Sequence, residues 1–201
     1  MSYWDHVRPV RRARAVAIGE LAREAGRLLD EGGVDALTVR ALAGRMGVAP
    51  ASLYSRVESA DDLLDLALDH ALADDVDLQR AMTEGGHRGL YLAYYRHLRR
   101  HPWAPRVIGL RAPRGPAYLR LSERFCELLE GEGVDDPLTM TYAMSNFVIG
   151  SAATDPIVES ERDSPIDVDL APVYARLHMR HEVDPEAIVA AGLRALRDLS
   201  A

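Results

Sequence analysis

The stretch TVRALAGRMGVAPASLYSRV, residues 38–57, decides the fold. Its apolar residues recur at helical spacing in two short runs, with Gly47 and Val48 between them. Two short helices joined by a glycine-containing turn form a helix-turn-helix, whose second helix can lie in the major groove of DNA. Because any small helical domain contains such a pair, the spacing alone leaves a purely structural role open.

The side chains of this stretch divide into an inner and an outer set. The apolar spacing directs Leu42, Val48, Leu53 and Val57 inward, leaving small, hydroxyl and arginine side chains outside. Hydroxyl groups can hydrogen-bond phosphates or base edges, and an arginine can bind a guanine or a phosphate. The predicted DNA contacts are Thr38, Val39, Arg40, Pro50, Ala51, Ser52, Tyr54, Ser55 and Arg56.

The charge of the chain is unevenly distributed. The formal net charge is −7, but residues 1–57 carry nine Arg against six Asp or Glu. The remainder carries fifteen Arg against twenty-five acidic residues, and the chain contains no lysine. A basic N-terminal part on an acidic body is compatible with a nucleic-acid reader, since only the contacting surface must be positive. Arg8, Arg11, Arg12 and Arg14 precede the first helix and could form an arm that contacts phosphates, and the sequence leaves open whether that arm is ordered.

Helical periodicity continues through the rest of the chain. A first helix is predicted to end at Gly32-Gly33, and a fourth at 59–77 connects to segments near 87–100, 103–110, 116–131, 137–153, 170–181 and 185–199. The acidic segment 155–169 contains two prolines and is predicted to be a loop. The prediction is an all-α chain: an N-terminal three-helix DNA-binding domain (1–58), then a helical-bundle domain (59–201) for ligand binding and dimerisation.

The segment LTVRALAGRMGVAPASLYSRVESADDLLDLALD resembles the DNA-binding domain of the TetR family of bacterial transcriptional regulators. The matching elements are Leu37-Thr38, Arg40, Leu42-Ala43, Gly47-Val48, Ser52-Leu53-Tyr54, Val57 and Leu63-Leu64. The C-terminal part more weakly resembles the tetracycline-repressor branch, at His101-Pro102-Trp103, at Glu123 and in the helix from Tyr142 to Gly150. The resemblance implies a homodimer with an effector pocket in each subunit, which is released from a palindromic operator when the effector binds. It also favours a repressor, because most members of the family are repressors.

Three positions depart from what the resemblance implies. The family commonly has a phosphate-binding lysine after the recognition helix, and this chain has Ala60 there. The tetracycline repressor holds magnesium through a histidine whose place is taken here by Ile108, and an amide-bearing ligand contact is replaced by Leu90. We therefore expect an effector other than a magnesium–tetracycline complex, and no cofactor or metal.

Aromatic and polar side chains of the second domain are the candidates for an effector pocket. Aromatic faces with a few polar groups suit a flat, largely apolar molecule. At helical spacing the same residues also serve as ordinary core. The predicted pocket residues are Tyr91, Tyr94, Tyr95, His97, His101, Trp103, Ile108, Arg111, Asn146 and Phe147.

Two histidine pairs have a spacing that can bind a metal, His97 with His101 and His178 with His181. No carboxylate or cysteine near His97 and His101 completes a ligand set, and neither pair is predicted to bind a metal. For the homodimer, the candidate surfaces are the helices at about 137–153 and 185–199, because the last helix is apolar on more than one face. A helix that only completes its own bundle is the alternative.

Other functional classes are less compatible with the sequence. It contains no nucleophile elbow, zinc-protease, P-loop or Rossmann motif, so we predict that the chain is not an enzyme. The one cysteine, Cys126, lies on an amphipathic run and is predicted to be a packing residue. The charge-free run 138–154 is too short and polar for a membrane span, and a cytoplasmic location is expected. A helical adaptor that binds protein remains the alternative function.

Overall fold

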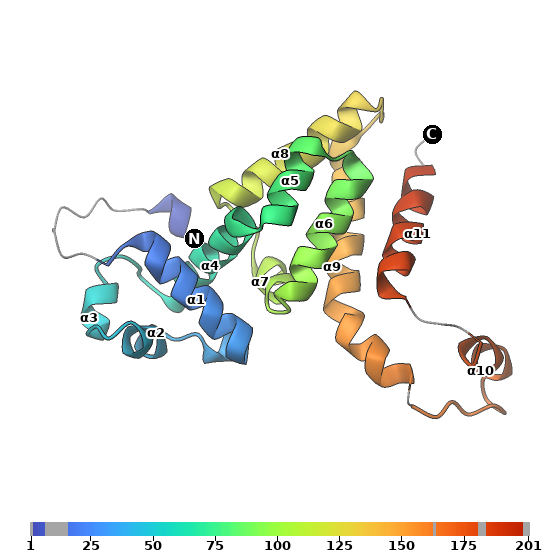
Figure 1. Ribbon diagram of the computed structural model, residues 1–201, viewed down its shortest axis with the longest axis horizontal. Helices are drawn as coiled ribbons and strands as arrows, with labels where there is room; N and C mark the ends of the chain where they lie inside the picture. The colour runs from blue at the N-terminus through green and yellow to red at the C-terminus, as the bar shows by residue number, and fades with distance from the viewer. Residues whose placement is uncertain (1, 7–15, 163, 181–183, 199–201) are drawn as a thin grey trace.

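A computed structural model describes residues 2–6, 16–162, 164–180 and 184–198. Over these ranges the chain forms eleven α-helices and two short 3₁₀ helices, without a strand (Figure 1). The predicted all-α fold is therefore confirmed. None of the helices in the same ranges is long and apolar enough to span a membrane.

The N-terminal helices form a reading unit, which we define as α1 (Ile18–Gly32), α2 (Val39–Arg45) and α3 (Pro50–Leu53). The helix α1 packs along α4 (Ala60–Asp74), because its apolar residues repeat at helical spacing on one face. The buried members of that face are Leu21, Ala22, Ala25 and Leu29. A short 3₁₀ helix, η2 (Val34–Ala36), leads from α1 to α2.

The remaining helices form a bundle around α9 (Pro137–Arg162), which packs against α6 (His87–Arg100), α8 (Pro116–Gly131) and α11 (Pro185–Asp198). The helices α5 (Val76–Glu84) and α7 (Ala104–Leu110) pack on α6 and α9 respectively. The short α10 (Pro172–His178) lies apart from the packed helices, at the end opposite the reading unit (Figure 1).

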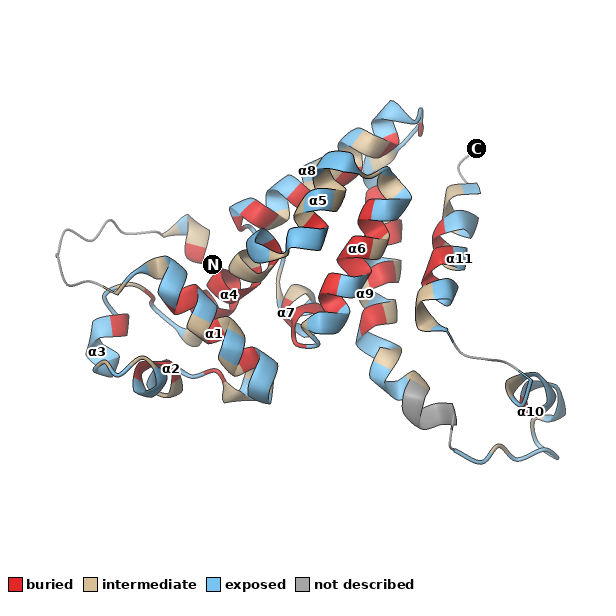
Figure 2. Ribbon diagram, in the orientation of Figure 1, coloured by how far each residue is buried: buried red, intermediate tan, exposed pale blue. Residues whose placement is uncertain are grey.

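The helix α4 lies between the reading unit and the bundle, and Figure 2 shows it largely buried. Every residue from Asp62 to Leu68 is buried, including the carboxylates of Asp62 and Asp65. One hydrophobic core continues from α1 through α4 into the bundle. The division into domains 1–58 and 59–201 stays a prediction, and the α3–α4 loop lies at its boundary.

Two predicted boundaries are wrong. The connector expected at 59–77 ends at Asp74, because Asp75 is extended and its side chain accepts a hydrogen bond from Leu78 N, which starts α5. The predicted loop 155–169 is helical as far as Arg162, with Pro156 inside α9. Asp155 accepts a hydrogen bond from the Tyr95 hydroxyl at 2.7 Å and pairs with Arg99 at 2.5 Å, and these contacts hold α9 against α6 just before the proline.

Candidate nucleic-acid interface

The turn between α2 and α3 is built as the sequence predicts. Thr38 caps α2, with its hydroxyl oxygen accepting a hydrogen bond from Ala41 N at 3.0 Å. Gly47 adopts a φ of +66°, which an L-residue rarely tolerates, and so turns the chain between the two helices. Leu42, Ala43 and Leu53 are fully buried and hold α2 and α3 on the core.

The outer face of α3 and of the residue that follows it is exposed. Pro50, Ala51, Ser52 and Ser55 are exposed, and 59% of Tyr54 is accessible although Leu53 beside it is fully buried. The Ser55 hydroxyl donates a hydrogen bond to Ser52 O at 2.7 Å, so it is engaged locally. A large aromatic side chain is thus held outward on a rigid support.

The other predicted contacts differ in exposure. Thr38 and Arg40 are exposed, and Arg56 is half-buried. The Val39 side chain is only 8% exposed, because it belongs to the inner face of α2, so only its backbone can face outward. Arg8, Arg11, Arg12 and Arg14 lie outside the described residues.

An arginine that the sequence did not single out fixes the geometry of the reading unit. Arg45, at the end of α2, forms two hydrogen bonds of 2.6 Å with Glu31 and one of 3.1 Å with Glu24. These bonds raise the pKa of Arg45 and lower the pKa of the Glu31 carboxyl. For Glu24, desolvation acts to raise the pKa, but the bonds from arginine outweigh it and the pKa is lowered. Arg45 therefore joins α2 to α1, and this arginine is used in the fold.

The predicted pocket tyrosines are packed in the bundle. Tyr91, Tyr94 and Tyr95 of α6 are buried, and the Tyr91 ring stacks on Phe125 of α8 at a centroid distance of 3.9 Å. Burial raises the pKa of Tyr91 to about 12 and that of Tyr94 well above its ordinary value. The Tyr94 hydroxyl, near the Tyr118 phenol, makes no well-formed hydrogen bond with the described residues.

Three other predicted pocket residues join a polar network at the end of α6. His97 is fully buried and shares a hydrogen bond of 2.7 Å with Asp75 through Nδ1, while its Nε2 lacks a partner among the described residues. His101 and the Trp103 indole both bond Oδ1 of Asp30 on α1, at 2.8 and 2.6 Å. This network connects the reading unit to the bundle.

Burial lowers the pKa of His97, although the bond to Asp75 opposes the shift. For Asp75, burial acts to raise the pKa, but hydrogen bonds from His97, Leu78 N and Arg100 outweigh it and lower the pKa. His97 and His101, the histidine pair at the end of α6, are thus bonded to different aspartates. No group of three or more His, Cys, Asp or Glu side chains with metal-binding geometry occurs within the part of the chain that is described.

The last four predicted pocket residues are dispersed. Ile108 is partly buried on α7, and Asn146 is exposed on α9. Phe147 packs closely against Gly192 of α11. Arg111 turns toward α4, where it bonds Asp61 and Asp65.

A cavity of about 410 Å³ lies elsewhere, between α1, α4 and the end of α6. Its lining combines small residues, Ala22, Gly26 and Ala67 among them, with charged residues of α1, α4 and the end of α6. His101 is the one predicted pocket residue in its lining. A second cavity of about 150 Å³ is lined by Arg99, Pro102, Ala152, Asp155 and Pro156.

Sequence reasoning missed three carboxylates of α4 that make polar contacts with other elements. Asp62 accepts a hydrogen bond from Glu58 N at 2.6 Å, and Asp65 binds the N-terminal residues and Arg111. Asp69 caps the start of α8, where its Oδ1 accepts from Ala117 N at 2.6 Å. The spacing of 62, 65 and 69 on one helical face was the available signal.

Comparisons with known proteins agree with this geometry. Residues 21–67 match the profile described as bacterial regulatory proteins, tetR family. An HTH-type transcriptional regulator of Saccharopolyspora erythraea is 38% identical over 138 residues, which are 65% of this chain and 57% of that protein. The HTH-type transcriptional repressor DrrR1 of Streptomyces coeruleorubidus is 28% identical over 143 residues, covering 68% of this chain and 53% of that protein. The matched region thus spans little more than half the length of either relative.

A solved structure supports the whole-chain fold. A possible TetR family transcriptional regulator from Streptomyces coelicolor A3(2) superposes with a TM-score of 0.75 at 25% identity, covering 90% of this chain and 97% of that one. The helix-turn-helix with its exposed tyrosine, the family profile over residues 21–67 and this superposition agree with one another. Residues 21–67 are similar to the bacterial regulatory proteins of the tetR family, and the chain shares the fold of this TetR family structure.

Proposed function

We propose that this chain is a ligand-responsive transcriptional regulator that binds a palindromic operator as a homodimer. The observation that carries the proposal is the 59% exposure of Tyr54 on a reading unit whose neighbouring Leu53 is fully buried. Folding gains nothing from an aromatic side chain held in water, whereas a tyrosine hydroxyl can donate to a phosphate. Exposed Arg40, Ser52 and Thr38 supply further donors on the same unit.

Two reading units are needed for a palindrome, and the exposed apolar residues of the bundle favour a dimer. On α9, 56% of Leu138 and 63% of Tyr142 are exposed, and on α11 Ile188 is 46% exposed. The opposite face of α11, at Val189 and Leu193, is buried in the bundle. The proposed interface is formed by α9 and α11 of both subunits, each helix burying one face internally and one against its partner.

The proposed effector is a small, largely apolar or aromatic molecule that binds among the aromatic residues of α6 and α8. Tyr91, Tyr94 and Phe125 offer ring faces, and the Tyr94 hydroxyl lacks a well-formed hydrogen bond among described residues. A ligand that carries a hydrogen-bonding group can satisfy that hydroxyl, which would otherwise be buried at a cost. Its binding releases the operator, so the regulator acts as a repressor, in keeping with the name of DrrR1.

The test is to select fragments of sheared genomic DNA with the purified protein at two salt concentrations and to sequence them. Recovery of a palindrome, with binding that weakens steeply as salt rises, is the expected result, because phosphate contacts release counterions. Recovery of nothing above background, even at low salt, would reject DNA binding and favour a protein-binding adaptor.

A matched pair of variants locates the contact. Tyr54→Ala is expected to weaken operator binding at least about tenfold, equivalent to ~1.4 kcal/mol. Tyr174→Ala removes a tyrosine that is 48% exposed on α10, outside the proposed interfaces, and should leave the affinity for the operator within about twofold. Equal losses in both variants would remove Tyr54 from the interface.

A further inference from the structure

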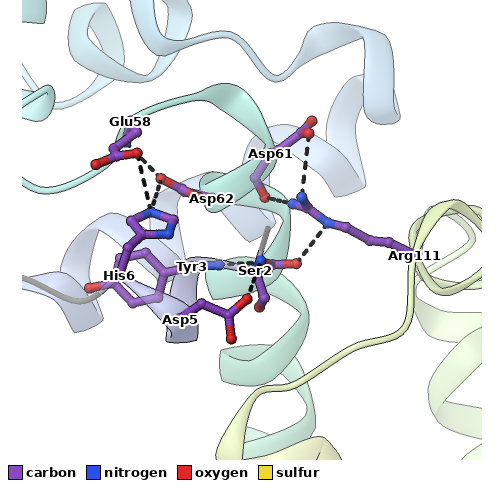
Figure 3. Close-up of polar contacts among 9 residues, drawn as sticks. Ser2, Tyr3, Asp5, His6, Glu58, Asp61, Asp62 and Arg111 are labelled. Atoms are coloured by element: carbon purple, nitrogen blue, oxygen red, sulfur yellow. Dashed lines mark hydrogen bonds and ion pairs between the residues drawn. The ribbon is translucent and has the colours of Figure 1, made fainter.

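The N-terminal residues of the chain are joined to the first half of α4. A short 3₁₀ helix, η1 (Tyr3–Asp5), packs on α4 beside the start of that helix. The Ser2 hydroxyl and Tyr3 N both donate to Oδ2 of Asp65, at 2.9 and 2.8 Å. His6 Nε2 lies 3.1 Å from Oδ2 of Asp62. Figure 3 draws this contact.

Arg111, from the segment between α7 and α8, reaches the same carboxylate from the bundle. Its Nε lies 3.1 Å from Oδ1 of Asp65, and its guanidinium also donates to the backbone oxygen and carboxylate of Asp61 (Figure 3). Asp65 is therefore bound through one oxygen by the N-terminal residues and through the other by the bundle. We call the set Ser2, Tyr3, His6, Asp62, Asp65 and Arg111 the α4 clamp.

The two carboxylates of the clamp are buried, so they need their hydrogen-bond donors to stay in place. Asp65 is 6% exposed and Asp62 is 2% exposed, and a buried carboxylate is costly unless its oxygens are hydrogen-bonded or paired with a cation. Any displacement of the segment that carries Arg111 leaves Asp65 with fewer donors. The bundle and α4 are therefore expected to move together, or to separate only at a large cost.

The clamp lies close to the reading unit along the chain. α3 ends at Leu53, and Glu58 N donates to Asp62 at 2.6 Å, so the loop after α3 is bonded to the clamp itself. Trp4 lines a small crevice together with Asp65 and with Pro113, Arg114 and Gly115 of the segment before α8. The N-terminal residues thus contact α4 and the α7–α8 segment at once.

We propose that the α4 clamp fixes the orientation of the reading unit relative to the bundle, with Arg111 and the N-terminal residues 2–6 as positioning elements for DNA binding. The proposal rests on the proposed function, because it concerns how the helices that would contact DNA are held in position. Arg111 bonds Asp61 and Asp65 of α4, so the role assigned to it is to place α2 and α3.

Two variants of the full chain break the clamp from opposite sides: Arg111→Ala, and deletion of residues 2–6. The matched control is Arg106→Ala. Arg106 on α7 also forms an ion pair across to the N-terminal helices, with Asp35 of η2 at 3.5 Å, but both side chains of this pair are exposed. Exposed pairs of that kind contribute little. A further variant, Arg111→Lys, keeps the charge but not the planar set of donors, and should restore binding only in part.

The first measurement is amide hydrogen exchange followed by mass spectrometry, without DNA. In both clamp variants, exchange in the peptides that span residues 50–65 is expected to rise about tenfold, while exchange in α8 and α9 stays unchanged. Arg106→Ala should leave all peptides within about twofold of the wild type. An increase spread evenly over the chain would mean that the clamp only stabilises the fold, and an absence of any increase would also overturn the proposal.

The second measurement is affinity for the fragments that the wild-type protein selects. Both clamp variants should bind them about tenfold more weakly, at an unchanged slope against salt, because no phosphate contact is lost. Faster local exchange with unchanged affinity would refute a positioning role in DNA binding. If the wild-type protein selects no DNA, the proposed function fails by itself. The clamp is then rejected as a positioning device for DNA binding. The exchange data would still show whether the clamp holds α4.

Discussion

Replacing Gly192 by alanine is expected to destabilise the protein, although alanine is the better helix former. Gly192 lies inside α11, and a Cβ built on it would lie 2.6 Å from Cε1 of Phe147 on α9 and closer still to Cζ. The aromatic ring must therefore move, which separates two helices of the proposed dimer and effector region. Overpacking of a core contact costs ~1–3 kcal/mol.

The control is Gly89→Ala on α6, where a Cβ would meet nothing within 4 Å. Both substitutions gain about 1 kcal/mol of helix propensity, so the difference between the two variants isolates the packing cost. We expect Gly89→Ala to be the more stable of the two by ~1–3 kcal/mol. For a chain of this length that corresponds to roughly 2–4 °C in melting temperature for each kcal/mol.

The assay is unfolding in urea and by heat, followed by circular dichroism at 222 nm, with Phe147→Leu as a second background. In that background the smaller side chain makes room, and Gly192→Ala should lose most of its cost, which a double-mutant cycle measures. Equal stabilisation by both glycine substitutions in the wild-type background would show that α11 does not pack closely on Phe147. The reasoning about this helix pair would then be refuted.

Three further outcomes are expected. Burial lowers the pKa of His97, so below the unfolded value of about 6.5 the unfolded chain binds a proton that the folded chain does not, and the free energy of unfolding falls. His97→Gln removes this group, and urea titrations of the variant should show a smaller loss of stability between about pH 7.5 and 5.5. The hydrogen bond to Asp62 raises the pKa of His6, whose other neighbours are Glu58 and the Tyr3 ring. The stability that protonated His6 contributes is lost as the pH rises through that pKa. His6→Gln should therefore lower the melting temperature more at about pH 6 than at about pH 8. Leu138→Glu on α9 should shift the mass measured by light scattering from dimer toward monomer, whereas Leu119→Glu, exposed on α8, should not.

The reading unit was predictable because its signals are local. The Thr38 cap, the glycine turn at 47 and the apolar spacing of Leu42, Leu53 and Val57 each act within a few residues, and each is present in the structure. The same locality explains why the tyrosine at 54 was expected outside. The DNA contacts themselves stay a prediction.

The bundle was less predictable because its features depend on residues distant in sequence. Helical spacing places Tyr91 on the apolar face of its helix, but it does not predict that Phe125 stacks on the Tyr91 ring. Arg111 was expected in a pocket, and nothing near it in sequence indicates that Asp61 and Asp65, about fifty residues earlier, bind it. Likewise, Pro156 suggested a break, whereas contacts of Asp155 with α6 keep the helix continuous.

The stack of Tyr91 on Phe125 has a consequence for the dose at which an effector acts. If the proposed effector binds between these rings, it can bind only the fraction of molecules in which the two rings have separated. Its apparent dissociation constant is the intrinsic one divided by that fraction, so a state populated at about 1% weakens the apparent affinity about a hundredfold. The response threshold of the regulator is then set by its own core, and a substitution that loosens the stack without touching the ligand would lower the concentration needed for induction.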